Sequence, residues 1–82
     1  MINYEKVLFD LVAPIVDDPK SVSVKQMESL NENEVLLYIY AKSEDIARLI
    51  GRQGSMAMAI RNTMGVASRV DGKRISVKFE SY

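Results

Sequence analysis

Residues 46–55 have the sequence IARLIGRQGS, in which two glycines separated by two polar residues join one helical pattern to another. Glycine permits backbone angles that other residues avoid, and it places no side chain between a turn and a ligand. The N–H groups of such a turn, and those at the start of the following helix, favour a bound anion. Arg52 lies inside the turn and Arg48 one helical turn before it, which is typical of a clamp for a phosphate backbone. A helix C-cap followed by a tight turn explains the same four residues.

The composition predicts one small globular domain without thiol or imidazole chemistry. The chain has 82 residues, of which 48% are hydrophobic, and equal numbers of acidic and basic side chains. A chain of this length buries only about 60–65% of its extended surface, so its core is modest. Because it contains neither Cys nor His, disulfides, thiolate zinc sites and the commonest general base are excluded. We therefore expect no enzyme, no metal site and no cofactor.

The sequence shows no membrane or targeting signal. No apolar run approaches the roughly 20 residues that a membrane span requires. The first residues lack the basic and apolar regions of a secretory signal. We therefore expect a cytoplasmic protein with no membrane contact and no small-molecule substrate.

Charge is divided unevenly between the two halves of the chain. Residues 1–41 carry three basic and seven acidic side chains and residues 42–82 carry eight and four, giving net charges of −4 and +4. The basic half suits an anionic partner. Solvation of the surface explains the split equally well, and the zero net charge of the whole chain argues against strong binding to duplex nucleic acid.

Three helices are predicted from apolar residues at three- and four-residue steps. The first covers residues 4–16, with a kink or break at Pro14. The second follows Ser43, its N-cap, and ends at Gly51. The third covers residues 55–69 and is weakened by an internal glycine. Its core-facing residues are Ala57, Ile60, Met64 and Ala67.

Three strands are predicted from alternating apolar and polar residues. They cover residues 20–28, 34–42 and 74–80, and the first two form an antiparallel hairpin. Two helices separate the second strand from the third, which predicts a parallel crossover between them. The aliphatic side of the second strand is assigned to the core, and Tyr38 and Tyr40 to the open face. The result is a two-layer α+β fold of order α-β-β-α-α-β, with a three-stranded mixed sheet and helices on one face.

This order and the central turn resemble a KH domain of the type II, prokaryotic variant, spanning residues 1–82 as a single domain. The isoleucine immediately before the first glycine of the turn is part of the resemblance. Further segments are similar to the short bacterial single-KH proteins of the KhpA type. These segments are residues 11–19, Ser43-Glu44-Asp45, Ala59-Ile60-Arg61 and Gly72-Lys73-Arg74.

The resemblance implies single-stranded RNA binding, in which the turn holds the backbone of about four nucleotides. The predicted RNA-binding residues are Gly51, Arg52, Gln53 and Gly54 in the turn, Ile46, Leu49 and Ile50 along an apolar groove, and Arg48, Ser55 and Arg61 beside them. The family also implies a small RNA chaperone or post-transcriptional regulator that affects cell growth and shape. Such proteins form a homodimer or pair with a larger KH-containing protein.

Two pairs of residues admit two interpretations. Met58 stands where the family often has a polar or basic residue, and Met56 adds a second methionine beside the turn. The two either fill irregular gaps or suit the groove to a protein, which would make the chain an interaction adaptor that has lost most RNA binding. Tyr38 and Tyr40 are either covered by the aliphatic parts of neighbouring lysines or form a self-association surface.

Overall fold

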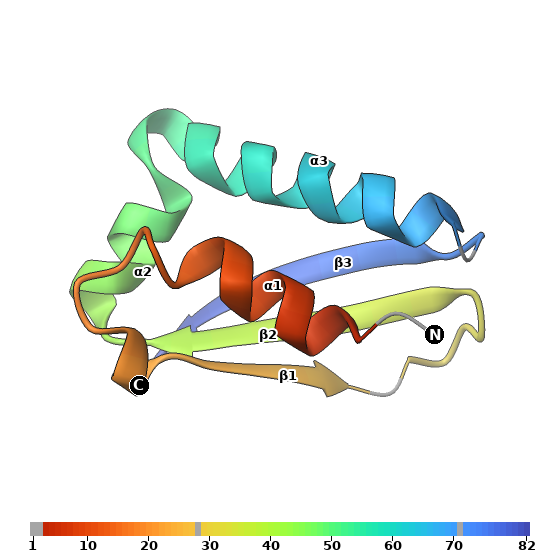
Figure 1. The fold of residues 1–82 in the computed structure, drawn as a ribbon, viewed down its shortest axis with the longest axis horizontal. Coiled ribbons are helices and arrows are strands. Elements are labelled where there is room, and N and C mark those ends of the chain that lie inside the picture. The colour runs from red at the N-terminus through yellow and green to blue at the C-terminus, as the bar shows by residue number, and fades with distance from the viewer. Residues whose placement is uncertain (1–2, 28, 71) are drawn as a thin grey trace.

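Three helices cover one face of a three-stranded sheet in the computed structural model, which describes residues 3–27, 29–70 and 72–82 (Figure 1). The helices are α1 (Tyr4–Val12), α2 (Ser43–Ile50) and α3 (Ser55–Val70), and the strands are β1 (Ser23–Met27), β2 (Glu34–Ala41) and β3 (Arg74–Ser81). Two single turns of 3-10 helix, η1 (Pro19–Ser21) and η2 (Arg52–Gly54), precede β1 and α3. The predicted α-β-β-α-α-β order is therefore confirmed.

The middle of the sheet is β2, which pairs antiparallel with β1 and parallel with β3, as predicted. At the centre of the sheet Leu37 lies between Gln26 of β1 and Val77 of β3. A parallel pair needs a connection that returns the chain to the other end of the sheet. Helices α2 and α3 form this connection, and the turn between them lies at the upper left of Figure 1.

The core lies between the inner face of β2 and the three helices. Every second residue of β2 is buried, which confirms the predicted aliphatic face. The helices contribute Tyr4, Leu8 and Val12 from α1, Leu49 from α2, and Ala57, Ile60 and Met64 from α3. Ala67, also predicted for the core, is only half-buried, and Ser68 beside it is buried instead. Its hydroxyl donates to the carbonyl of Gly65 at 2.9 Å, so its burial leaves no hydroxyl without a partner.

The first helix and the first strand are both shorter than predicted. α1 ends at Val12, two residues before Pro14, because Pro14 has no N–H to donate to the carbonyl of Asp10 and so cannot continue the helical hydrogen bonds. The chain then turns through η1, so β1 begins only at Ser23 and not at residue 20. Residue 28, the predicted end of this strand, lies outside the described residues.

The ends of α2 and α3 also differ from their predictions. Lys42, and not Ser43, occupies the N-cap of α2, and its side chain makes no capping hydrogen bond. α3 continues through Gly65 to Val70, one residue beyond the predicted end. After α3 the N–H of Lys73 donates to the carbonyl of Ser68 at 3.1 Å, a bond typical of the Schellman motif. Among the described residues, no helix is both long and apolar enough to cross a membrane.

Candidate nucleic-acid interface

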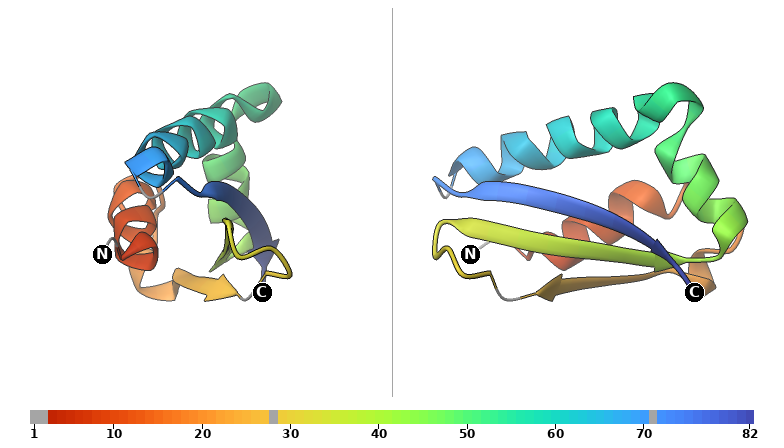
Figure 2. Two further views of the ribbon diagram at one scale, coloured as in Figure 1. Left: turned by 90° about the vertical axis from the view of Figure 1, so that its right-hand side faces the viewer. Right: turned by 180° about the vertical axis from the view of Figure 1, so that it is seen from behind.

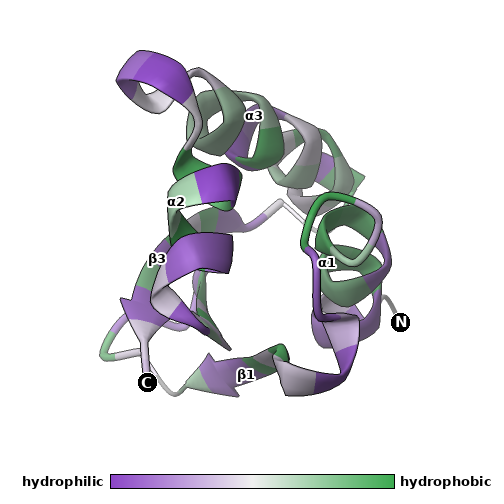
Figure 3. Ribbon diagram, turned by 90° about the vertical axis from the view of Figure 1, so that its left-hand side faces the viewer, coloured by the Kyte–Doolittle hydropathy of each residue, from purple (hydrophilic) through white to green (hydrophobic). Residues whose placement is uncertain are grey.

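The turn between α2 and α3 projects beyond both helices and is hydrophilic (purple at the top of Figure 3). It begins at Gly51, whose φ of 75° ends α2. A Cβ atom on Gly51 would lie 2.7 Å from the Cβ of Met56 and 2.9 Å from its backbone nitrogen. Gly54 also has a positive φ of 76°, but a Cβ there would meet nothing within 4 Å. Only the first glycine is therefore required by packing as well as by backbone conformation.

Two backbone N–H groups of the turn are left for a ligand. The N–H of Gly54 donates to the carbonyl of Gly51 at 3.2 Å, and the N–H of Ser55 donates to the carbonyl of Arg52. Within the part of the chain that the structure describes, the N–H groups of Arg52 and Gln53 have no acceptor. They are consecutive and precede the first turn of α3, where the helix dipole also favours negative charge. The turn thus offers two consecutive N–H donors to an anion.

The side chains of the turn face solvent. Arg52, Gln53 and Ser55 are all exposed. No ion pair within the described ranges engages Arg52. Its guanidinium is therefore available for a charge-assisted bond to a phosphate that also contacts the turn.

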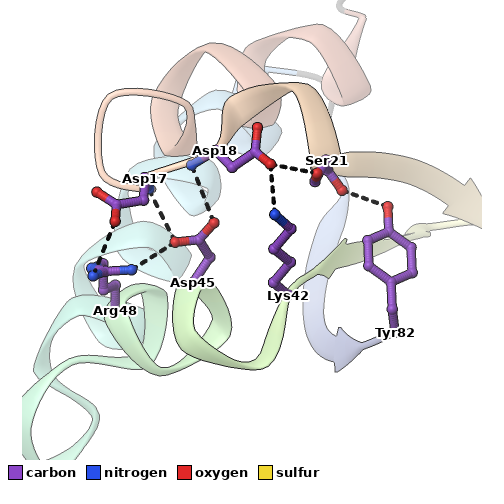
Figure 4. A network of polar contacts seen from close by, with 7 residues as sticks. All are labelled: Asp17, Asp18, Ser21, Lys42, Asp45, Arg48 and Tyr82. Atoms are coloured by element: carbon purple, nitrogen blue, oxygen red, sulfur yellow. Dashed lines mark hydrogen bonds and ion pairs between the residues drawn. The ribbon is translucent and has the colours of Figure 1, made fainter.

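Arg48 has a different position from the one predicted. Its Nη1 lies 2.8 Å from Oδ1 of Asp45, and its Nη2 lies 3.3 Å from Oδ2 of Asp17 (Figure 4). Asp45 lies in the first turn of α2, and Asp17 lies in the segment that follows α1. The structure therefore places Arg48 in an ion-pair cluster, and its contact with RNA stays a prediction.

Only two of the three apolar residues predicted for the groove reach the surface. Ile46 is half-buried and Ile50 is 38% exposed, whereas Leu49 is 0% exposed. Leu49 is part of the hydrophobic core. It supports α2 from beneath and has no surface for a base, so the prediction that it contacts RNA is wrong in this structure.

Arg61 lies over the free edge of β3. Its Nη2 donates to the carbonyl of Val77 at 3.3 Å, and its guanidinium carbon lies 5.4 Å from the centre of the Phe79 ring. Since β3 pairs with β2 on its other side, the carbonyl of Val77 belongs to the outer edge of the sheet. Arg61 is itself exposed, so its remaining N–H groups are open to a ligand that follows this edge.

The two methionines beside the turn have different environments. Met56 is half-buried and packs against the core, where its Cβ is the atom that excludes a side chain at Gly51. Met56 therefore fills space beneath the turn. Met58 is 62% exposed on the surface of α3.

A cavity of about 390 Å³ lies at the opposite end of the sheet, between the start of α1 and the hairpin. Glu5, Glu32 and Glu34 line it together with one basic residue, Lys73. Three carboxylates against one ammonium repel phosphate, so this cavity does not suit RNA.

Asp45 has a structural role that sequence reasoning missed. It is 2% exposed, and its two carboxylate oxygens accept the backbone N–H groups of Asp17 at 3.0 Å and Asp18 at 3.3 Å. The N–H of Asp17, followed by that of Asp18 and the guanidinium of Arg48, lowers the pKa of Asp45. The acidic pattern at the start of α2 indicated only an interaction with the helix dipole. The backbone partners of Asp45 lie on a distant segment and could not be found from local sequence.

A second ion pair holds the same two segments together. Nζ of Lys42 lies 2.9 Å from Oδ2 of Asp18, and the same oxygen accepts the hydroxyl of Ser21 at 2.7 Å (Figure 4). The bond from Lys42 lowers the pKa of Asp18 and raises that of Lys42. The hydroxyl of Tyr82 donates to the carbonyl of Ser21 at 2.6 Å, which adds the end of the chain to the cluster.

Comparison with known proteins identifies relatives along almost the whole chain. The model of a family described as KhpA/KhpB, KH domain, matches residues 5–79. The RNA-binding protein KhpA of Clostridium perfringens is 32% identical over 74 residues, which cover 89% of this chain and 96% of the relative. That of Lactiplantibacillus plantarum is 36% identical over 81 residues, covering 98% and 92%. That of Oceanobacillus iheyensis is 33% identical over 64 residues, covering 78% and 81%.

Proposed function

This chain belongs to the KhpA/KhpB family of KH domains, and we propose that it binds single-stranded RNA through the turn between α2 and α3. The observation that carries the proposal is the pair of consecutive N–H groups at Arg52 and Gln53, which have no acceptor among the described residues. Gly51 holds this turn in its conformation, and the exposed guanidinium of Arg52 adds a positive charge. A phosphate in the turn would receive both backbone N–H groups and the arginine.

The neighbouring surfaces suggest how the rest of the strand is held. Ile46 and Ile50 expose apolar surface on α2, against which bases can pack. Arg61 at the edge of β3 supplies a second cation. If about three phosphates are neutralised, the slope of log K against log salt is only about −2. One domain therefore binds weakly and tolerates many sequences.

The test reverses the charge of the turn. We expect Arg52→Asp to weaken binding of a short single-stranded RNA at least tenfold, measured by fluorescence anisotropy at low salt. Lys20→Asp is the matched control, because Lys20 is exposed in η1 and undergoes the same change of charge. Melting temperatures of both variants establish that they are folded. Unchanged RNA affinity in folded Arg52→Asp would favour the interaction adaptor that Met58 suggests.

We also propose that two copies of the chain pair through α3. Its outer side carries Met58, Val66 and Val70, whose side chains are 62%, 63% and 78% exposed. These residues are separated by four or eight positions, so they lie in one row along the helix. Asn62 continues the row, which therefore lacks charge. Large exposed apolar side chains in such a row mark an interface. Pairing would also raise weak RNA affinity through effective concentration.

Light scattering tests the pairing directly. The wild-type protein should show twice the mass of one chain, and Val66→Glu should reduce it to a monomer with an unchanged melting profile at low concentration. A wild-type monomer over the whole concentration range would contradict the proposal, and a mass gain only after mixing with a longer KH protein would favour the heterodimer. The roles in RNA chaperoning and in cell growth and shape, and the cytoplasmic location, stay predictions.

A further inference from the structure

The sheet face that points away from the helices carries two stacked tyrosines. Figure 2 shows the three helices gathered on one side of the sheet, which leaves the other side open along the described chain. Tyr38 and Tyr40 project from this side of β2, where they alternate with buried aliphatic residues. Their ring centroids are 6.1 Å apart and their planes differ by 17°. The two rings, each half-buried, therefore lie stacked next to each other on this face, in agreement with the predicted open face.

The strand register places a lysine on each side of these rings. Lys25 of β1 and Lys78 of β3 are both paired with Tyr38, so the three side chains form a row across the sheet. Both lysines are exposed. Within the described ranges neither takes part in an ion pair. Two unneutralised cations thus flank the aromatic surface.

Acidic groups on the same face do not cancel this charge. Glu80 is paired with Tyr40, and Glu34 is paired with Arg74 at the start of β3. Glu34 also accepts the hydroxyl of Ser29 at 3.0 Å. The face therefore carries two carboxylates against three cations, and the lysines are the charges nearest Tyr38.

We propose that Lys25, Tyr38, Tyr40 and Lys78, here called the tyrosine face, bind a second segment of single-stranded RNA. Bases would stack on the rings, and the lysines would contact the flanking phosphates. Such stacking tolerates any base, because every base has an aromatic face. The proposal goes beyond the turn at Gly51–Gly54, since it uses the opposite layer of the molecule.

The tyrosine face is better suited to RNA than to another copy of the chain. Lysine is depleted from protein–protein interfaces, whereas here it borders the aromatic centre on both sides. The phosphates of RNA complement these charges, while a second copy would add two more lysines to the same interface.

The edge of β3 connects the tyrosine face to the first RNA surface. Arg61 contacts Val77 and Phe79, the two neighbours of Lys78 along the strand. Successive side chains of a strand point to opposite faces, so Lys78 leads to the tyrosine face while Phe79 stays beneath Arg61. A single strand can therefore pass from the turn over Arg61 and Lys78 to the tyrosines.

The test compares two lengths of oligouridine, of about four and about twelve nucleotides. Tyr38→Val with Tyr40→Val removes the rings and puts in their place β-branched residues, which also favour a strand. We expect roughly tenfold weaker binding of the longer RNA and unchanged binding of the shorter one. Tyr38→Phe with Tyr40→Phe is the matched control and should bind as the wild type does. Lys25→Gln with Lys78→Gln should lower the salt slope for the longer RNA by about 1.4, the value for two phosphates.

Further measurements distinguish loss of RNA binding at the tyrosine face from unfolding of the protein and from loss of binding at the turn. Melting temperatures establish that each variant is folded, and crosslinking with mass spectrometry locates the contact on the folded wild-type protein. Loss of binding for both lengths in Arg52→Asp, with crosslinks to β2 in the wild type, supports both proposals. Equal affinity of the folded valine variant and the wild type for the longer RNA overturns the second proposal alone. A change of oligomeric state in the valine variant, without a change in RNA affinity, would show that the tyrosine face is a protein interface.

Discussion

The carboxylate of Asp45 accepts the backbone N–H of Asp17 at 3.0 Å, although 28 residues separate the two. Asp45 is in the first turn of α2, and α2 ends at the glycine that opens the RNA-binding turn proposed above. Asp17 belongs to the segment that follows α1. The bond therefore fixes the orientation of α2, and with it the turn, relative to the first helix.

Asp45→Ala should destabilise the protein and misplace α2. The substitution leaves the N–H groups of Asp17 and Asp18 without an acceptor, and it leaves Arg48 with one acidic partner fewer. We expect the melting temperature to fall by several degrees. Glu44→Ala is the matched control, because Glu44 is exposed in the same helical turn and carries the same charge. Equal melting temperatures for the two variants would contradict this role.

Acid should destabilise the wild-type protein through the same carboxylates. Hydrogen bonds lower the folded-state pKa of Asp45 and Asp18, whereas the unfolded chain keeps the usual value of about 3.9. A lowered pKa contributes stability that is fully present above the unfolded value and is lost as the pH falls toward the folded value. Melting temperatures should thus be nearly constant from about pH 5 to 7 and drop below about pH 4.

The asparagine variant isolates the contribution of Asp45. Asp45→Asn has no charge to lose at this position, so its melting temperature should depend less steeply on pH below about 4 than that of the wild type. Parallel curves for the two proteins would show that other carboxylates dominate the acid transition.

The fold could be predicted because each element carries its own periodicity. Every second residue of β2 is buried, and α3 buries residues at helical spacing. Both patterns can be recognised from residues that are close together in the sequence. The boundaries near Pro14 and Ser43 differ from the prediction, because they depend on how one segment packs against the next. The α+β class and the order of elements therefore followed from sequence, and the exact ends did not.

The candidate site was predictable only in part, for a related reason. The glycines of the turn can be recognised locally, since few residues adopt a positive φ. The partners of Arg48 and the depth of Leu49 depend on how α2 is rotated against distant segments. Local pattern placed both near the turn, but only the packed structure shows that one is ion-paired and the other buried.

Gly51→Ala should damage the turn far more than Gly54→Ala. Both glycines have a positive φ, which costs another residue about 1–2 kcal/mol. At Gly51 the added Cβ would also lie 2.7 Å from the Cβ of Met56, whereas at Gly54 it would meet nothing within 4 Å. Calorimetry and RNA binding should show a large loss for the first variant and a loss of about 1–2 kcal/mol in stability for the second. Similar losses in both would indicate that the turn relaxes to admit a side chain.

Gly65→Ala should stabilise the protein, although Gly72→Ala should destabilise it. Gly65 lies within the continuous helix α3, and a Cβ there would meet nothing within 4 Å. Alanine in a helix is more favourable than glycine by about 1 kcal/mol, partly because it restricts the unfolded chain. Gly72 also has open space around it, but its φ is +66°, so the same methyl group is unfavourable there. Denaturant unfolding at low protein concentration measures both free energies of unfolding. A loss of stability in Gly65→Ala would mean that a partner packs closely against α3 at this glycine.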